Sequence, residues 1–215
     1  MLTVCITGGS GSGKSTLTQL ISQKLPQQQV TLLPMDAYYK SQGHLSSDEK
    51  QTFNFDHPDA FDFELFIEHL QLLKLYVPIE RPSYSFLNCT RQRQTETVHP
   101  GNIILIDGIF ALLNDDLKKE IDLKFFLDVN EQNRLSRIMQ RDVAERGRTP
   151  ESVTERFYRQ VKPMHDEFVD TSKISSDVIL DFNDGDVIPA SKVILSLIQN
   201  CVELQAKKNI TETKQ

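Results

Sequence analysis

The sequence has few of the features that mark membrane, secreted or nucleic-acid-coating proteins. No apolar run approaches the roughly 20 residues of a membrane span, and no basic region or cleavage site precedes the apolar segment that begins at residue 2. Three widely spaced cysteines, at positions 5, 89 and 201, form neither a disulfide framework nor a zinc pattern. The net charge of −6 argues against coating nucleic acid. We expect a protein of the reducing cytoplasm, without membrane or nucleic-acid partners.

The charge is unevenly distributed along the 215 residues, of which 39% are hydrophobic and 25% charged. Residues 131–162 carry eight basic against five acidic side chains, so this stretch is +3 and the rest of the chain is −9. Such a composition suits one large α/β domain with a sizeable core. A basic segment in an acidic protein indicates a small anionic ligand.

Residues 8–15 read GGSGSGKS and match the phosphate-binding pattern G-x-x-x-x-G-K-[ST]. Glycines let the backbone bring its N–H groups against phosphate oxygens, Lys14 adds a mobile cation, and the Ser15 hydroxyl can hold Mg²⁺. A flexible Gly/Ser linker would lack the apolar segment before the motif and the helical spacing after it, which Pro26 ends. The predicted nucleotide-binding residues are Gly8, Gly9, Ser10, Gly11, Ser12, Gly13, Lys14, Ser15 and Thr16.

Apolar runs alternate with helical patterns, which predicts an α/β fold with a doubly wound parallel sheet of the P-loop NTPase type. Strands are expected at 2–7, 30–35, 102–106, 123–128 and 177–181, and helices at 14–25, 62–75, 115–120, 130–146, 151–168 and 188–206. We expect one domain over 1–206, which includes an ordered excursion at 40–58, an inserted β-hairpin at 77–98, and a helical lid at 141–165, followed by a disordered tail at 207–215.

Two of the predicted strands end in an aspartate. Asp36 follows the strand at 30–35, and Asp107 follows the strand at 102–106. Ligands of open α/β sheets bind at the carboxyl ends of the strands, so both carboxylates are predicted to face the nucleotide. The alternative is that they are turn or helix-cap residues, a common use of aspartate.

The residues after Asp107 argue against two common classes of nucleotide hydrolase. Gly108 stands where ATP-hydrolysing motors have a glutamate that activates water, and the guanine-reading motif N-K-x-D of GTPases does not occur. Transfer of the γ-phosphoryl group to a second small molecule remains. Asp36 is the candidate general base on the acceptor hydroxyl of that molecule.

The segment R-D-V-A-E-R-G-R at 141–148 places arginines where a helix ends and a loop begins. A lid that carries Arg141 and Arg146 would neutralise charge on the transferring phosphoryl group and exclude water. The alternative is a solvated helix end in which Arg141 pairs with Glu145, four residues on.

These motifs together resemble the uridine kinases (uridine–cytidine kinases) over roughly residues 2–205. The resemblance rests on GGSGSGKS at 8–15, M-D-A-Y-Y-K at 35–40, N-F-D-H-P-D-A-F-D at 54–62, Y-S-F at 84–86, D-G-I-F-A-L at 107–112 and R-D-V-A-E-R-G-R at 141–148. It implies a doubly wound sheet, a hairpin over the nucleoside, a mobile lid and a homotetramer. The implied reaction is phosphorylation of the 5′-hydroxyl of uridine or cytidine, with Mg²⁺ and with ATP or GTP as donor.

The resemblance also implies a role for each matched residue. Asp36 would be the general base, and Lys14, Arg141 and Arg146 would stabilise the transferring phosphoryl group. Ser15 and Asp107 would hold Mg²⁺, although the family usually has glutamate at position 107. The residues implied at the acceptor are Asp56 on the ribose hydroxyls, Tyr84 against the pyrimidine, and Cys89, Arg148 and Arg156 near the base. Phe86 is implied as a further substrate-binding residue.

Three acceptor positions depart from the family pattern. Cys89 stands where the family has a histidine that reads the pyrimidine edge, Ile138 replaces a ribose-contacting arginine, and Arg156 replaces a glutamine. A thiol is a weak hydrogen-bond partner, so Asn88 or Arg137 would have to compensate. Three alternatives stay open: a divergent uridine kinase, a kinase of a different nucleoside or small alcohol, and a catalytically inactive nucleotide-binding regulator.

Overall fold

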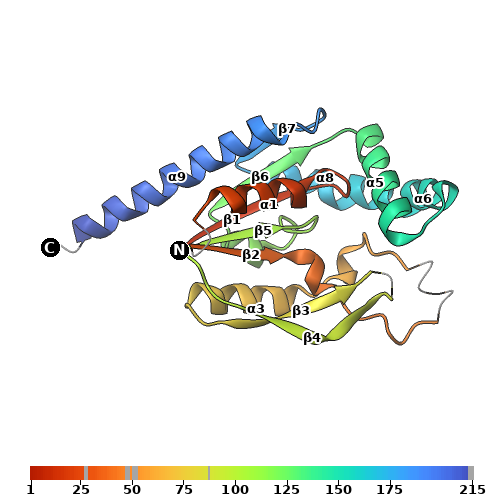
Figure 1. Ribbon diagram of the computed structural model, residues 1–215, viewed down its shortest axis with the longest axis horizontal. Coiled ribbons are helices and arrows are strands. Elements are labelled where there is room, and N and C mark those ends of the chain that lie inside the picture. Colours follow the sequence, from red (N-terminus) through yellow and green to blue (C-terminus); the bar gives the residue numbers. More distant parts are fainter. Residues whose placement is uncertain (27–28, 47–48, 50–52, 87, 213–215) are drawn as a thin grey trace.

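Five parallel strands form the central sheet of the computed structural model, in the order β2-β5-β1-β6-β7 (Figure 1). The structure describes residues 1–26, 29–46, 49, 53–86 and 88–212. The strands are β1 (Leu2–Gly8), β2 (Val30–Pro34), β5 (Ile103–Asp107), β6 (Leu123–Asp128) and β7 (Val178–Asp181). Runs of Val, Ile, Leu and Phe suit strands that are buried on both faces. All five predicted strands are confirmed, each within one residue at either end.

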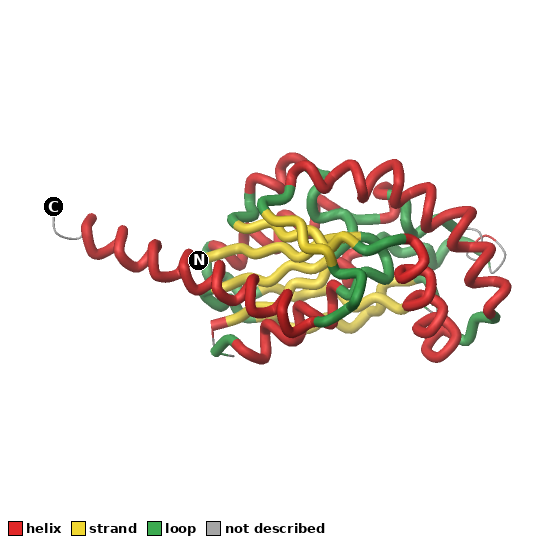
Figure 2. Tube along the Cα trace, turned by 90° about the horizontal axis from the view of Figure 1, so that it is seen from above, coloured by secondary structure: helices red, strands yellow, loops and turns green. Residues whose placement is uncertain are grey.

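Helices cover both faces of this sheet (Figure 2). On one face, Val4 and Ile6 of β1 pack with residues of α1 (Lys14–Lys24) and α9 (Val187–Glu212). On the other face, Cys5 belongs to a core formed with α3 (Phe63–Lys74) and α4 (Asp115–Lys119). Alternate residues of one strand therefore serve opposite layers, as expected for a doubly wound α/β fold. This confirms the predicted fold class.

A separate antiparallel hairpin lies beyond the β2 edge of the sheet (Figure 1). It consists of β3 (Ile79–Ser85) and β4 (Thr90–Val98), with a register shift between Pro82 and Tyr84. Arg81 donates from Nη1 to the Leu32 carbonyl of β2 at 3.1 Å, which links the hairpin to the sheet. The hairpin predicted at 77–98 is confirmed.

The arginine-bearing segment is helical on both sides of Gly147. Helix α5 (Glu131–Arg146) ends at this glycine, whose φ of 63° is in the left-handed region. A second helical run starts at α6 (Pro150–Arg156), with Thr149 as its N-cap. It continues through the π turn η4 (Phe157–Val161), α7 (Lys162–Met164), the π turn η5 (His165–Val169), α8 (Asp170–Ser172) and the 3-10 turn η6 (Lys173–Ser175). The run is thus longer than the predicted helix at 151–168.

The C-terminal segment corrects one prediction. Residues 207–212 were expected to be disordered, but α9 continues through Glu212 and extends past the body of the protein (Figure 1). Once a long helix has formed, each further residue adds a backbone hydrogen bond, which favours continuation of the helix beyond its apolar residues. Residues 213–215 lie outside the described part of the chain.

By length and composition alone, α9 over Val187–Lys207 could cross a membrane. Only 22% of its most apolar window is buried. Its buried residues Ala190, Ile194 and Ile198 pack against the sheet, which is the role of an amphipathic core helix. The absence of a membrane partner stays a prediction.

Candidate active site

The glycine-rich loop joins β1 to α1 in a backbone conformation that requires its glycines. Gly11 and Gly13 have φ of 77° and 91°, where other residues are strained. A Cβ on Gly11 would also lie 2.6 Å from the Arg134 carbonyl oxygen, so the loop packs closely on α5. Gly13 directly precedes α1, and the free N–H groups of the first helical turn therefore face the space above the loop. The local geometry is that of an anion-binding loop.

Lys14 is almost fully buried inside this loop. Its Nζ donates to the Gly9 carbonyl at 3.0 Å, and its side chain lines a cavity of about 410 Å³. Burial lowers the pKa of Lys14 to about 8, although the nearby carboxylates Asp36 and Asp107 oppose this shift. A buried ammonium with so few partners is suited to neutralise a bound anion.

Asp36 and Asp107 lie at the carboxyl ends of the neighbouring strands β2 and β5, as predicted. Pro34 pairs in register with Asp107, and both aspartates line the cavity. Burial raises the pKa of Asp107, the hydroxyl of Ser15 opposes this by donating a hydrogen bond, and the charge of Asp36 raises the pKa further. The two carboxylates and the Ser15 hydroxyl therefore provide oxygen ligands of the kind that Mg²⁺ prefers.

Within the described residues, no group of three or more His, Cys, Asp or Glu side chains is arranged to hold a metal ion. Mg²⁺ is commonly bound by one or two protein ligands together with phosphate oxygens and water.

The lid arginines surround one buried carboxylate, Asp142 of α5. Arg141 Nε lies 2.8 Å from its Oδ1, Arg146 Nη1 3.5 Å from the same oxygen, and Arg148 Nε 3.9 Å from Oδ2. The Asp142 carbonyl also accepts hydrogen bonds from the N–H groups of Gly147 and Arg148. Asp142 thus fixes both the helix end and the cations. In the described chain the ion pair of Arg141 is with Asp142, and not with Glu145 as in the alternative above.

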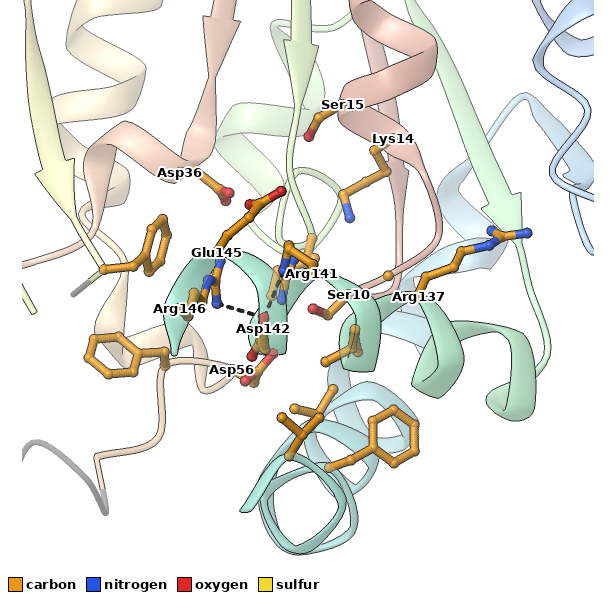
Figure 3. A pocket seen from close by; sticks show the side chains of 18 of the residues that line it. Ser10, Lys14, Ser15, Asp36, Asp56, Arg137, Arg141, Asp142, Glu145 and Arg146 are labelled. Carbon is orange, nitrogen blue, oxygen red and sulfur yellow. Dashed lines mark hydrogen bonds and ion pairs between the residues drawn. The ribbon is translucent and has the colours of Figure 1, made fainter. Parts of the chain in front are cut away.

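Figure 3 shows how these groups face one another across the cavity. Lys14, Ser15 and Asp36 lie on one wall, while Arg141, Asp142 and Arg146 lie on α5 opposite. The lid and the loop are far apart in the sequence, and the packing of α5 on the glycine loop brings them together.

Another part of the cavity wall surrounds Asp56, one of the predicted acceptor residues. Its residue exposure is 9%, and Arg156 Nη2 lies 3.5 Å from its Oδ2. Burial raises the pKa of Asp56, and the charge of Arg156 opposes this. Arg156 also lies over the Phe55 ring at 5.8 Å, and Arg146 lies over the Phe86 ring at 4.8 Å. The predicted acceptor residues Asp56, Phe86, Arg148 and Arg156 all line the cavity.

Tyr84 and Cys89 do not line the cavity. The Tyr84 ring packs on Tyr39 and Phe86, at centroid distances of 5.6 and 5.1 Å. Cys89 adopts a φ of 52° in the hairpin turn, and its Sγ donates to the Phe86 carbonyl at 3.6 Å. These two side chains support the cavity wall in this structure. Gly8, Gly9 and Ser12 likewise shape the loop without lining the cavity, whereas Ile138 forms part of its wall.

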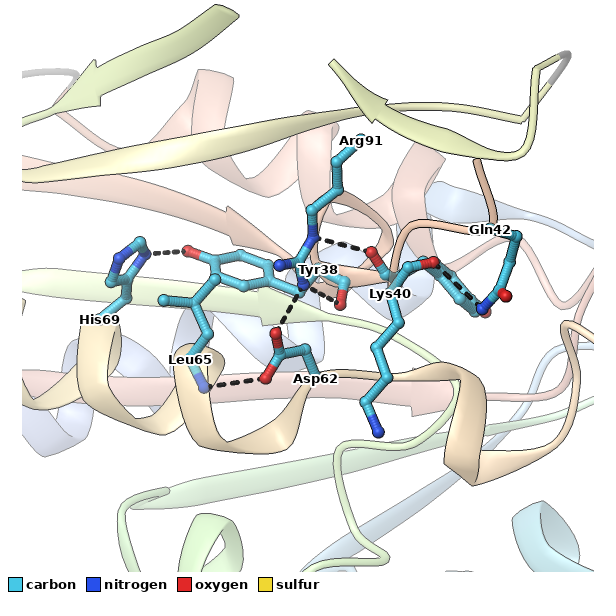
Figure 4. Close-up of polar contacts among 8 residues, drawn as sticks. Tyr38, Lys40, Gln42, Asp62, Leu65, His69 and Arg91 are labelled. Atoms are coloured by element: carbon cyan, nitrogen blue, oxygen red, sulfur yellow. Dashed lines mark hydrogen bonds and ion pairs between the residues drawn. The ribbon is translucent and has the colours of Figure 1, made fainter. Parts of the chain in front are cut away.

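A polar network that sequence reasoning missed ties the hairpin to the segment after Asp36 (Figure 4). Arg91 of β4 donates to the carbonyls of Tyr39 at 2.8 Å and Tyr38 at 2.9 Å, and pairs with Asp62 at 2.9 Å. Asp62 also caps α3 by accepting from the Leu65 N–H. The network ties β4 to the residues that follow Asp36. The partners of Arg91 lie far away in the sequence, so local spacing does not predict these contacts.

A phosphate loop at the carboxyl edge of a doubly wound parallel sheet, beneath a lid that carries arginines, defines a P-loop kinase. The chain belongs to the Phosphoribulokinase / Uridine kinase family, whose sequence pattern matches residues 3–187.

Curated relatives named uridine kinase support this assignment. The protein of Staphylococcus epidermidis is 42% identical over 175 residues, covering 81% of this chain and 84% of the relative. The protein of Macrococcus caseolyticus is 38% identical over 199 residues, covering 93% and 96%.

Solved structures share the fold at lower identity. A possible uridine kinase from Bacillus stearothermophilus has a TM-score of 0.59 at 22% identity, covering 84% of this chain and 88% of that one. Phosphoribulokinase from Rhodobacter spheroides has a TM-score of 0.63 at 14% identity, covering 84% and 70%.

Proposed function

We propose that this protein transfers the γ-phosphoryl group of ATP to the 5′-hydroxyl of uridine or cytidine, a step of pyrimidine salvage. The observation that carries the proposal is the single cavity in which the phosphate loop, Asp36 and the lid arginines meet. The identity of about 40% to uridine kinases supports the choice of acceptor.

Asp36 is the general base in this proposal. Its carboxylate stands at the end of β2 beside the phosphate loop, where it can accept the proton of an acceptor hydroxyl that attacks the γ-phosphorus. Lys14, Arg141 and Arg146 surround the transferring group with positive charge. Phosphoryl transfer depends mainly on such positioning and charge stabilisation.

Ser15 and Asp107 would hold Mg²⁺, which would offset the charge of the phosphates when bound. The hydrogen bond from Ser15 to Asp107 brings the hydroxyl and the carboxylate together, which supports this role. The nucleotide itself would lie on residues 8–16, with its phosphates against the loop N–H groups.

Asp56 would accept hydrogen bonds from the two ribose hydroxyls, because a carboxylate can serve both. Arg156, already paired with Asp56, would keep that carboxylate ionised and oriented. Phe86 offers an apolar face to a pyrimidine, supported from behind by Tyr84 and by the turn that contains Cys89. Arg148 would provide a donor at the base edge.

A second acceptor class is favoured by the contact of Cys89. Its thiol donates to a carbonyl of its own hairpin, so it does not take the place of the base-reading histidine that the resemblance implies. A kinase of a different nucleoside or a small alcohol would fit this difference. We further propose that the enzyme acts in the cytoplasm as a homo-oligomer.

The test is a panel of nucleosides and sugar alcohols with Mg·ATP, scored by the release of ADP. Turnover on uridine or cytidine supports the proposal. If no pyrimidine nucleoside is phosphorylated and another alcohol is, the substrate belongs to the second acceptor class. If no compound of the panel is phosphorylated, both acceptor classes are contradicted.

A further inference from the structure

The guanidinium group of Arg134 is buried behind the phosphate loop without an ion-pair partner. Burial lowers its pKa, and the charges of Asp166, Glu131 and Asp170 oppose this without pairing with it. Arg134 lies on α5 and is 2% exposed, and neither its Nε nor its Nη1 has a hydrogen-bond partner. Among the described residues, no carboxylate forms an ion pair with it. Its guanidinium carbon lies 5.7 Å from the centroid of the Phe157 ring. An unpaired buried charge is costly, so a counter-charge supplied by a ligand would be strongly favoured.

Gly9 of the phosphate loop is the point at which this charge meets the loop. A Cβ built on Gly9 would lie 2.9 Å from Arg134 Nη1 and 2.7 Å from His165 Nδ1, so both side chains touch its backbone. The carbonyl of the same glycine accepts the hydrogen bond from Lys14 at 3.0 Å. Three nitrogen-bearing side chains therefore converge on one residue of the loop.

Of the two side chains behind Gly9, Arg134 and His165, only Arg134 is charged at neutral pH. Burial and the charge of Arg134 lower the pKa of His165 to about 4, so its imidazole is neutral. Arginine stays protonated throughout the accessible pH range. The charge of Arg134 also contributes to lowering the pKa of Lys14. Two like charges thus flank Gly9, and a polyanion above the loop would relieve their repulsion.

We propose that Arg134 is a positioning residue whose unpaired positive charge favours the polyphosphate of the bound nucleotide. It acts through Gly9, holding the loop backbone in place and adding positive potential from behind, without touching the phosphates. His165 packs on the same glycine and confines the guanidinium. The inference rests on the phosphoryl donor of the proposed function, and not on the acceptor.

The test compares Arg134→Met with the wild type, with ATP and inorganic triphosphate as ligands. Methionine fills similar space without charge. The variant should melt at the same temperature as the ligand-free wild type or higher, because it removes an unpaired buried charge. Its Kd for both ligands should rise about tenfold or more, as expected for the loss of an interaction with a charged group. Arg134→Lys, which keeps the charge, should retain most of the affinity.

Arg159→Met is the matched control, because Arg159 is exposed and pairs only with Glu155 among the described residues. It changes the net charge equally and should leave the Kd unchanged. The inference is overturned if Arg134→Met melts lower or fails to fold without ligand, if its Kd equals that of the wild type, or if Arg134→Lys binds as weakly as Arg134→Met. Wild-type protein that binds ATP but does not phosphorylate uridine or cytidine contradicts the proposed function alone.

Discussion

The residues proposed to act in phosphoryl transfer lie on two walls of the cavity. Lys14 and Ser15 come from the phosphate loop, Asp36 and Asp107 from strand ends, and the lid arginines from α5 and the turn that follows. Each position follows from a local feature of the sequence: a motif, a strand end or a helix terminus. The clearest consequences of single substitutions concern Asp36, Lys14 and Arg156.

Asp36→Asn should lower kcat at least about 100-fold, because an amide cannot accept the proton of the acceptor hydroxyl. ATP binding, measured by calorimetry, should change little, since the proposed base acts on the acceptor. An Asn variant with full activity would show that the base is wrongly assigned.

The affinity for ATP should weaken as the pH rises through about 8, the pKa to which burial lowers Lys14. Below this pH the ammonium is charged and binds phosphate, whereas above it the neutral amine loses the ionic interaction. The Kd should rise by up to about tenfold per pH unit above 8. Lys14→Arg should remove this pH dependence, because a guanidinium does not titrate there. A flat profile in the wild type would contradict the role of Lys14.

Arg156→Gln should alter uridine binding and its pH dependence while leaving the KM for ATP unchanged. Burial raises the pKa of Asp56 and Arg156 opposes this, so the variant should have a higher Asp56 pKa. As the pH falls, protonated Asp56 loses an acceptor for the ribose hydroxyls, and the KM for uridine rises. In the variant this rise should begin at a higher pH. Superimposable KM–pH profiles would rule out this coupling.

Among the elements, α5 contributes the most to the site. One face of the helix packs on the phosphate loop and buries Arg134. Its C-terminal part and the turn that follows bring three arginines around Asp142. The π turns η4 and η5 follow within the next helical run, and η5 places His165 against Gly9. Such turns are frequent at functional sites.

Asp142→Asn should loosen this element. Loss of the buried carboxylate leaves the three arginines without their shared partner, so the free energy of unfolding should fall by about 1–3 kcal/mol. The value of kcat should also fall, because the lid cations lose their fixed positions. Urea unfolding and steady-state kinetics measure the two effects. As a control, Asp115→Asn removes an exposed ion pair with Lys118 and should cost less than about 0.5 kcal/mol. Equal stability in both variants would contradict the role of Asp142.

For the whole molecule, the sequence predicted the parts that depend on local pattern. The five strands, the hairpin and the phosphate loop follow from apolar runs and glycine spacing, and strand ends placed Asp36 and Asp107 together. Long-range packing decided the rest. The burial of Arg134, the long-range contacts of Arg91 and the turning of Cys89 into the hairpin all depend on residues distant in the chain or on turn geometry. The end of α9 was also missed, because helix continuation needs no apolar signal.

The most direct measurement is the identity of the product formed from uridine and Mg·ATP. Phosphorus NMR and mass spectrometry of the reaction mixture identify the phosphorylated position. We expect uridine 5′-monophosphate and ADP in equal amounts, with the same outcome for cytidine. ADP release without a 5′-monophosphate, or no reaction with either nucleoside, would contradict a pyrimidine nucleoside kinase.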